Sequence, residues 1–167
     1  MATNTLIQYL ETERFGSLPG GSTEAVPVSA MNRRQVETFV ASEAIAAGDV
    51  VSLDLSKTAD GDKGIFVSKA DTATATDRCA VGVALAAAAA AGDKVDVCVR
   101  GVCEANVDGA TAAGDLLQIS STAGRLEPRQ IAVDEGGAAT FNLFPIVGLA
   151  TEADVANVAT IFVYKQF

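Results

Sequence analysis

Two short sequence motifs each occur twice in this chain, and both are repeated at the same spacing. AAGDVV begins at Ala46 and AAGDLL begins at Ala112, while VGVA begins at Val81 and VGLA begins at Val147, so both pairs are offset by 66 residues. Two independent words in one register indicate an internal duplication. The duplication predicts that Gly48 matches Gly114 in the fold and that Gly82 matches Gly148.

The strand patterns that end the two repeats correspond as well. VDVCVR ends at Arg100, and TIFVYK ends at Lys165, one residue short of the common offset. We therefore divide the body of the chain into two pseudo-repeats, residues 35–100 and 101–167. Neither repeat alone buries enough surface to fold, so we expect the two to form one β-rich body.

The body, residues 35–167, has the pattern of short strands. Alternating or continuous runs of Val and Ile are separated by turn words that contain Gly and Asp, such as AGD, DGDKG, DGA, STAG and DEGG. Many short strands with such turns are typical of an all-β barrel or sandwich. The predicted strands lie in VETFVAS, DVVSLDL, GIFVSKA, CAVGVAL, KVDVCVRGV, DLLQIS, FPIVGLA and ATIFVYKQF.

The alanine run 86–91 is the exception to this β pattern. Alanine has the highest helix propensity, and Gly92 follows the run where a helix-ending glycine would stand. The matching segment of the second repeat begins with Thr151 and has Asp154 three residues later, which resembles a capping box. We expect one or two short helical turns at these places.

Residues 1–34 differ from the body and predict an extended N-terminal arm. The segment is rich in Gly, Ser, Thr and Pro and shows no alternation. Tyr9, Leu10 and Phe15 are apolar residues that could become buried when the arm orders on a partner. Arg33 and Arg34 stand where the arm meets the body and could anchor an acidic patch. The alternative is a disordered tail.

Composition and charge exclude several classes of function. The formal net charge is −9 and no basic cluster stands out, which disfavours nucleic acid and anionic membrane surfaces as partners. Aromatic residues make up 5% of the chain and Trp is absent, so a deep ligand pocket or a sugar platform is not expected. We find no signal peptide and no stretch that could span a bilayer, and expect a soluble protein made in a cytoplasm.

The chain offers few residues for catalysis or metal binding. It has no His, which excludes His-dependent triads and His-based metal sites. Its three cysteines, Cys79, Cys98 and Cys103, match no disulfide or zinc pattern and are expected as small apolar residues in a reduced compartment. The loop 60–64 resembles the start of a calcium loop but lacks the closing Glu, so we interpret it as a hairpin turn. No enzyme activity, cofactor or metal is expected.

One group of words resembles a known family. ASEAIAAGDVVSLD, followed by DRCAVGVALAAAAAAGDKVDVCVRGVCEANVDGATAAGDLL, is similar to the capsid cement, or decoration, proteins of tailed bacteriophages. The resemblance covers residues 36–117 well and the C-terminal words more loosely.

The resemblance implies a structural protein without catalytic residues. Members of the family are β-rich, usually trimeric, and bind the outer surface of the phage head, where terminal arms reach neighbouring capsid subunits. This implies a homotrimer located on the virion, with the major capsid protein as its partner. Our candidate capsid contacts are Tyr9, Leu10, Arg14, Phe15, Arg33 and Arg34.

Two other functions remain open at this stage. The chain could be a binding module on the virion surface, such as the base of a head fibre or a glycan-binding domain, although few aromatic residues are available for a glycan. A small hydrolase with paired carboxylates is the third alternative, but the sequence nominates no particular pair.

Overall fold

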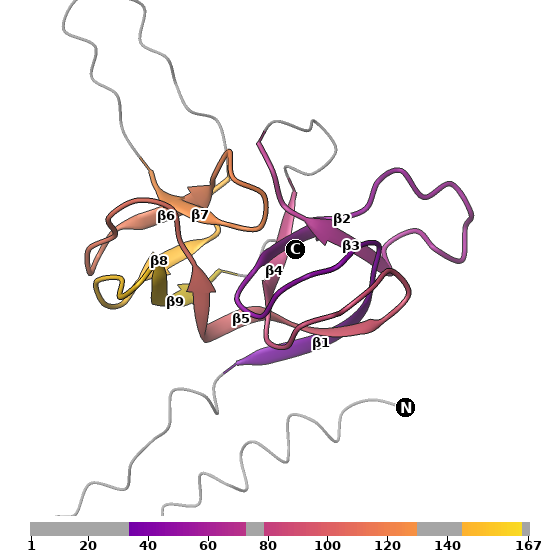
Figure 1. Ribbon diagram of the computed structural model, residues 1–167, viewed down its shortest axis with the longest axis horizontal. Coiled ribbons are helices and arrows are strands. Elements are labelled where there is room, and N and C mark those ends of the chain that lie inside the picture. Colours follow the sequence, from indigo (N-terminus) through magenta and orange to yellow (C-terminus); the bar gives the residue numbers. More distant parts are fainter. Residues whose placement is uncertain (1–33, 73–78, 130–144, 165–167) are drawn as a thin grey trace, which may run out of the picture.

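The computed structural model describes residues 34–72, 79–129 and 145–164, which form nine strands (Figure 1). The strands are β1 (Gln35–Ala41), β2 (Val50–Leu53), β3 (Phe66–Lys69), β4 (Ala80–Ala84), β5 (Lys94–Asn106), β6 (Leu116–Ile119), β7 (Leu126–Pro128), β8 (Gly148–Ala150) and β9 (Val158–Val163). The prediction of an all-β fold is confirmed. The predicted arm lies almost entirely outside the described residues.

The first five strands close into a small barrel. They pair in the order β1-β3-β2-β4-β5, and β1 pairs again with β5 to complete the ring. The β1–β3 pairing is parallel and the other pairings are antiparallel. A closed ring leaves no free sheet edge, which removes the usual site of strand aggregation.

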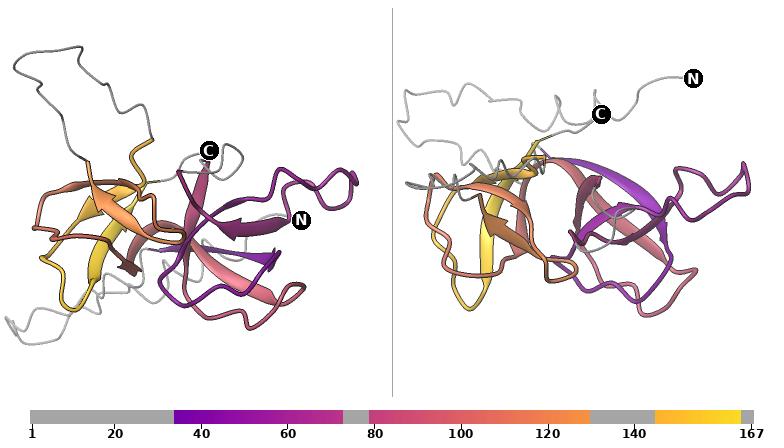
Figure 2. Two further views of the ribbon diagram at one scale, coloured as in Figure 1. Left: turned by 45° about the horizontal axis from the view of Figure 1, so that its top comes forward. Right: turned by 90° about the horizontal axis from the view of Figure 1, so that it is seen from above.

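The second half repeats these pairings around the C-terminal part of β5. That part pairs with β9, β9 with β8, β8 with β6 and β6 with β7, and a parallel bridge between Val107 and Leu126 completes the set. The two lobes lie side by side and are joined by β5, as Figures 1 and 2 show. A single 13-residue strand therefore belongs to both lobes.

The register of β2 and β4 matches that of β6 and β8 residue by residue. Adding 66 to the β2–β4 pairs gives the β6–β8 pairs: Val50↔Val83 corresponds to Leu116↔Leu149, and Val51↔Gly82 corresponds to Leu117↔Gly148. Gly48 and Gly114 both have positive φ, and each donates its N–H to the end of the following paired strand, at Ala84 and Ala150 respectively. Both predicted glycine pairs thus occupy equivalent positions.

The last strand of each half follows a different offset from the one that the sequence suggested. Ala84 pairs with Val97 in the first half, and Ala150 pairs with Ile161 in the second, so the closing strand is two residues short of the common offset rather than one. A shift by an even number keeps every side chain on its face, whereas a shift by one would turn the apolar side chains outward. The shortening lies in a two-residue turn at Ala156 and Asn157, which both have positive φ.

The predicted helical turns are wrong. No helix occurs among residues 79–129 and 145–164. Ala88 instead forms a β-bridge with Ile45, and Asp154 accepts a hydrogen bond from the N–H of Thr111, the residue equivalent to Ile45. The hydroxyl of Thr151 donates to the carbonyl of Thr160, so it does not cap a helix. Pairing with the neighbouring strand end outweighs the helix propensity of a short alanine run.

Each half carries a carboxylate that ties two strand ends together. In the first half Asp54 accepts hydrogen bonds from the hydroxyls of Ser42 (2.5 Å) and Ser56 (2.6 Å). In the second half Asp108 accepts from the hydroxyls of Thr122 (2.6 Å) and Ser120 (3.1 Å). By the offset of 66, Asp108 is the equivalent of Ser42, and Ser120 is the equivalent of Asp54. The hydrogen bond between these two positions is therefore present in both halves, but the carboxylate and the hydroxyl have changed places.

These bonds favour the charged form of each carboxylate. Burial raises the pKa of Asp54, but the hydrogen bonds from Ser42 and Ser56 and the charge of Lys57 outweigh burial and hold the pKa below its ordinary value. The hydroxyls of Thr122 and Ser120 lower the pKa of Asp108.

We predict that acid weakens the fold through these two groups. A carboxylate whose pKa is lowered by folding stabilises the folded state above its ordinary pKa of about 4, and this stabilisation is lost as the pH falls towards the folded pKa. Urea unfolding between neutral pH and pH ~2 should show a steeper loss for wild type than for Asp54→Asn with Asp108→Asn. The surface variant Asp60→Asn is the control. Equal slopes for all three proteins would contradict the role given to these bonds.

Gly82 and Gly148 test the equivalence of the halves. A Cβ atom at Gly82 would lie 2.2 Å from the carbonyl oxygen of Cys98, and one at Gly148 would lie 2.6 Å from the carbonyl oxygen of Phe162. Both obstacles are backbone atoms of a paired strand, which cannot rotate away. Gly82→Ala and Gly148→Ala should each lower the free energy of unfolding by about 2 kcal/mol or more, measured by denaturant titration. Gly61→Ala, where no atom lies within 4 Å, should change it little, and a neutral Gly82→Ala would contradict the close approach.

Candidate functional site

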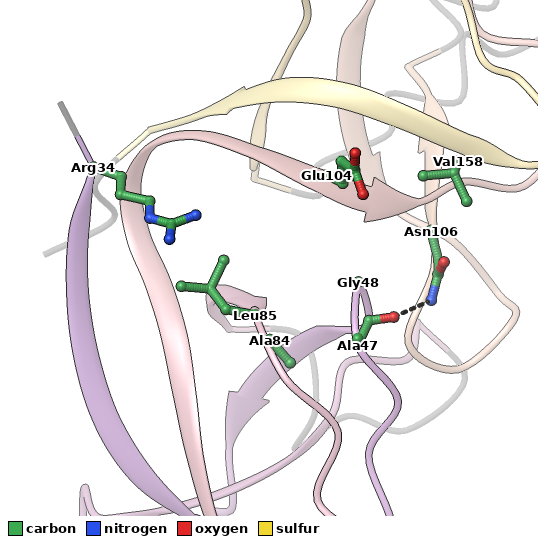
Figure 3. Close-up of a pocket in the computed structure, with 8 residues that line it drawn as sticks. All are labelled: Arg34, Ala47, Gly48, Ala84, Leu85, Glu104, Asn106 and Val158. Carbon is green, nitrogen blue, oxygen red and sulfur yellow. Dashed lines mark hydrogen bonds between the residues drawn. The ribbon is translucent and has the colours of Figure 1, made fainter. Parts of the chain in front are cut away.

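A hollow of about 290 Å³ lies where the two halves meet (Figure 3). It is lined in the described part of the chain by Arg34, Ala47, Gly48, Ala84, Leu85, Glu104, Asn106 and Val158. Arg34 and Leu85 lie at one side of the hollow, and Asn106 and Val158 at the other. Both repeats contribute to it, so its shape depends on how they pack together.

Asn106 and Asp49 form the polar contact beneath this hollow. The side-chain amide of Asn106 donates to the carboxylate of Asp49 (2.8 Å) and to the carbonyl of Ala47 (3.2 Å), and its backbone N–H donates to the carbonyl of Gly48 (2.8 Å). Asp49 is 7% exposed, and its other carboxylate oxygen accepts from the N–H of Ala46. The last residue of β5 therefore holds the first turn of the other repeat.

The turn between β6 and β7 also lies against Asp49 and the start of β2. Gly124 accepts a hydrogen bond from the N–H of Val50 (2.8 Å) and donates one to the carbonyl of Ala70 (2.9 Å). A Cβ atom at Gly124 would lie 2.9 Å from Cγ of Asp49, and Gly124 has a positive φ of 78°. Glycine is needed here for both reasons.

Arg34 is the one predicted contact residue that lies within the described chain. It precedes β1 and reaches into the hollow, towards the side where Leu85 lies (Figure 3). The other five predicted contacts, Tyr9, Leu10, Arg14, Phe15 and Arg33, lie outside the described residues. Arg34 therefore marks the place where the predicted arm joins the body, beside the junction of the two halves.

The hollow presents one guanidinium, one carboxylate and one amide among small and aliphatic side chains. None of its eight lining residues is aromatic, so it lacks the flat platform on which sugar rings stack. Sequence reasoning missed Glu104 and Asn106, because they read only as the outward-facing polar residues of an alternating strand.

None of the three cysteines is among the residues that line this hollow. Cys98 and Cys103 are buried on β5, and Cys79 is exposed. The hydrogen bond that the Cys103 thiol donates to Cys98, together with burial, raises the pKa of Cys103 well above its usual value. No group of three or more Cys, Asp or Glu residues in residues 34–72, 79–129 and 145–164 is arranged to hold a metal ion. The same residues contain no helix long and apolar enough to cross a membrane.

Comparison with known proteins gives a structural likeness without a sequence relative. No protein-family model matches the chain, and no curated protein matches it. Among solved structures, the chain is similar to the N-terminal base of the head fibre protein gp8.5 of bacteriophage phi29, with a TM-score of 0.52 and 16% sequence identity. The match covers 79% of this chain and 95% of that one. At this identity the likeness establishes a shared fold.

Comparing Asp49 with Asp115 separates the stability that the contact between the halves contributes from the stability that the turn contributes by itself. They occupy equivalent turns and accept equivalent bonds, from the N–H of Ala46 and of Ala112, but Asp49 also accepts the bond from Asn106. Asp49→Ala should lower the free energy of unfolding by about 2 to 3 kcal/mol, and Asp115→Ala by about 1 kcal/mol or less.

Thermal and urea unfolding of the two variants measure the difference. Asn106→Ala should account for most of it, and the double variant Asp49→Ala with Asn106→Ala should cost less than the sum of the single ones. Equal costs at Asp49 and Asp115 would show that the contact between the halves adds nothing to the stability of the turn.

Proposed function

We propose that this protein is a structural component of a tailed-phage virion that attaches to the outer surface of the head. The observation that supports this most strongly is the likeness to the base of the phi29 head fibre, which extends over nearly the whole of that base. The similarity of the repeat words to phage cement proteins points to the same location by an independent route. The proposed partner is the major capsid protein, and the proposed role involves no catalysis or cofactor.

The form of attachment that we favour is that of a head-fibre base. The matched structure is itself a base, and this chain covers 95% of it. The two lobes are joined along β5, which belongs to both of them. A homotrimer is the proposed assembly, as the family resemblance implies.

A cement protein is the second candidate function. The resemblance in residues 36–117 favours it, and an N-terminal arm that extends over neighbouring capsid subunits would suit it. Its mechanism would be additive, because each copy binds only the assembled shell and thereby stabilises it. The arm residues Tyr9, Leu10, Arg14, Phe15, Arg33 and Arg34 are the proposed capsid contacts in either case.

Binding to empty, expanded phage heads tests the shared proposal. The full chain should sediment with purified heads at a fixed number of copies per head, and should not bind free capsid protein. Deleting residues 1–33 should weaken binding at least tenfold while leaving the melting temperature within a few degrees of wild type. Absence of binding to heads of any phage that encodes the chain would overturn the proposal, and unchanged binding of the truncated chain would remove the arm from it.

Heating of decorated heads distinguishes the two candidates. A cement protein should raise the temperature at which heads open, whereas a fibre base should leave this temperature unchanged and form a discrete projection in electron micrographs.

A further inference from the structure

Each half carries one straight row of four apolar residues across four strands. In the first half the row runs through Val36, Cys98, Val83 and Val50, which face one another in the register of β1, β5, β4 and β2. The equivalent row in the second half runs through Val102, Phe162, Leu149 and Leu116. The pairing of the strands thus gives each half one apolar row at the equivalent place.

Three of the four residues of the first row are covered by the second half of the same chain, while Val36 at the end of the row is 38% exposed. Cys98, Val83 and Val50 are each 0% exposed, and they belong to a core cluster whose other members include Leu117, Ile119 and Leu126 of the second half. The turn between β6 and β7 fixes this cover, because Gly124 bonds the backbone of Val50 and Ala70. In this chain, therefore, the cover of the row comes from the second and third strands of the following repeat, β6 and β7, together with the turn between them.

The second row has no following repeat within the chain. Leu116 is 40% exposed, whereas its equivalent Val50 is fully buried. Leu149, Phe162 and Val102 are all partly exposed, and every one of the four is apolar. A surface row of Leu, Leu, Phe and Val is larger than the buried row that it repeats and has the character of an interface core.

The matching cover is exposed on the first half. The connection between β2 and β3, residues 54–65, takes the place in the first half of the shorter β6–β7 turn, residues 120–125, and it presents Leu55 (57% exposed) and Ile65 (46% exposed) to solvent. Both are among the exposed large hydrophobic residues of the described surface, and both lie on the β2–β3 connection.

We propose that a second copy of this chain covers the open row, with its β2–β3 connection placed against Leu116, Leu149 and Phe162. The connection would take the place beside the second row that the β6–β7 turn takes beside the first. The contact is heterologous, because the row of one copy meets the connection of the next, and such contacts form closed rings when the rotation permits. The inference concerns self-association in the absence of any capsid, so it stands whether or not the protein binds heads.

Sedimentation velocity of the full chain over a range of concentrations tests this contact. Wild type should associate, and Leu116→Glu and Leu55→Glu should each raise the dissociation constant about thirtyfold or more. Val155→Glu is the matched control, because Val155 is 78% exposed at the tip of the β8–β9 hairpin, outside both surfaces, and should associate as wild type does. Melting temperatures of all variants should stay near that of wild type.

Mixing the two variants gives the sharper result. Leu116→Glu keeps an intact connection and Leu55→Glu keeps an intact row, so an equimolar mixture should form a dimer of one copy each and nothing larger. A monomeric wild type, an association insensitive to Leu116→Glu, or a mixture that stays monomeric would each overturn the proposal. Should Leu116→Glu lower the melting temperature, Leu116→Ser replaces it with the same expected direction.

Discussion

The fold depends on one strand that two lobes share. The N-terminal part of β5 closes the first ring against β1 and β4, and its C-terminal part begins the second set of pairings against β9. A bend at Gly101, whose φ is 106°, lets the strand pass from one lobe into the other. Because the two halves meet within a strand and have no linker between them, opening either lobe exposes apolar residues of the other, and we expect them to unfold together.

The duplication is unequal at two places, and both bear on function. At the junction, Asp49 is buried and bonded by Asn106, whereas its equivalent Asp115 lies in an exposed turn. At the far end, Leu116 and Leu149 are exposed or partly exposed, although their equivalents Val50 and Val83 are fully buried. A repeat that covers its neighbour on one side and exposes the same surface on the other has the geometry of a unit for further assembly. This agrees with the proposed place of the protein in a virion.

Features that depend on local turns could be predicted from the sequence, whereas features that depend on contacts between distant residues could not. The repeat was visible in Ala46–Val51 and Ala112–Leu117, because turn glycines and Asp caps must be kept wherever the same turn recurs. The alanine run 86–91 misled, since helix propensity is weak against a β-bridge that Ile45 provides from far away in the sequence. The hollow could not be predicted, because Asn106 looks like any outward polar residue of a strand until its partner Asp49 is known. The open row was equally hidden, since Leu116 and Leu149 become an exposed face only when the pairing register is known.

Native-state amide hydrogen exchange tests the shared strand most directly. Amides at the centres of the β4–β5 and β5–β9 ladders should exchange with one common free energy of opening, equal to the free energy of global unfolding and equally dependent on denaturant. Exchange of the first ladder through an opening that leaves the second protected, or the reverse, would show two independently stable lobes and would contradict the account.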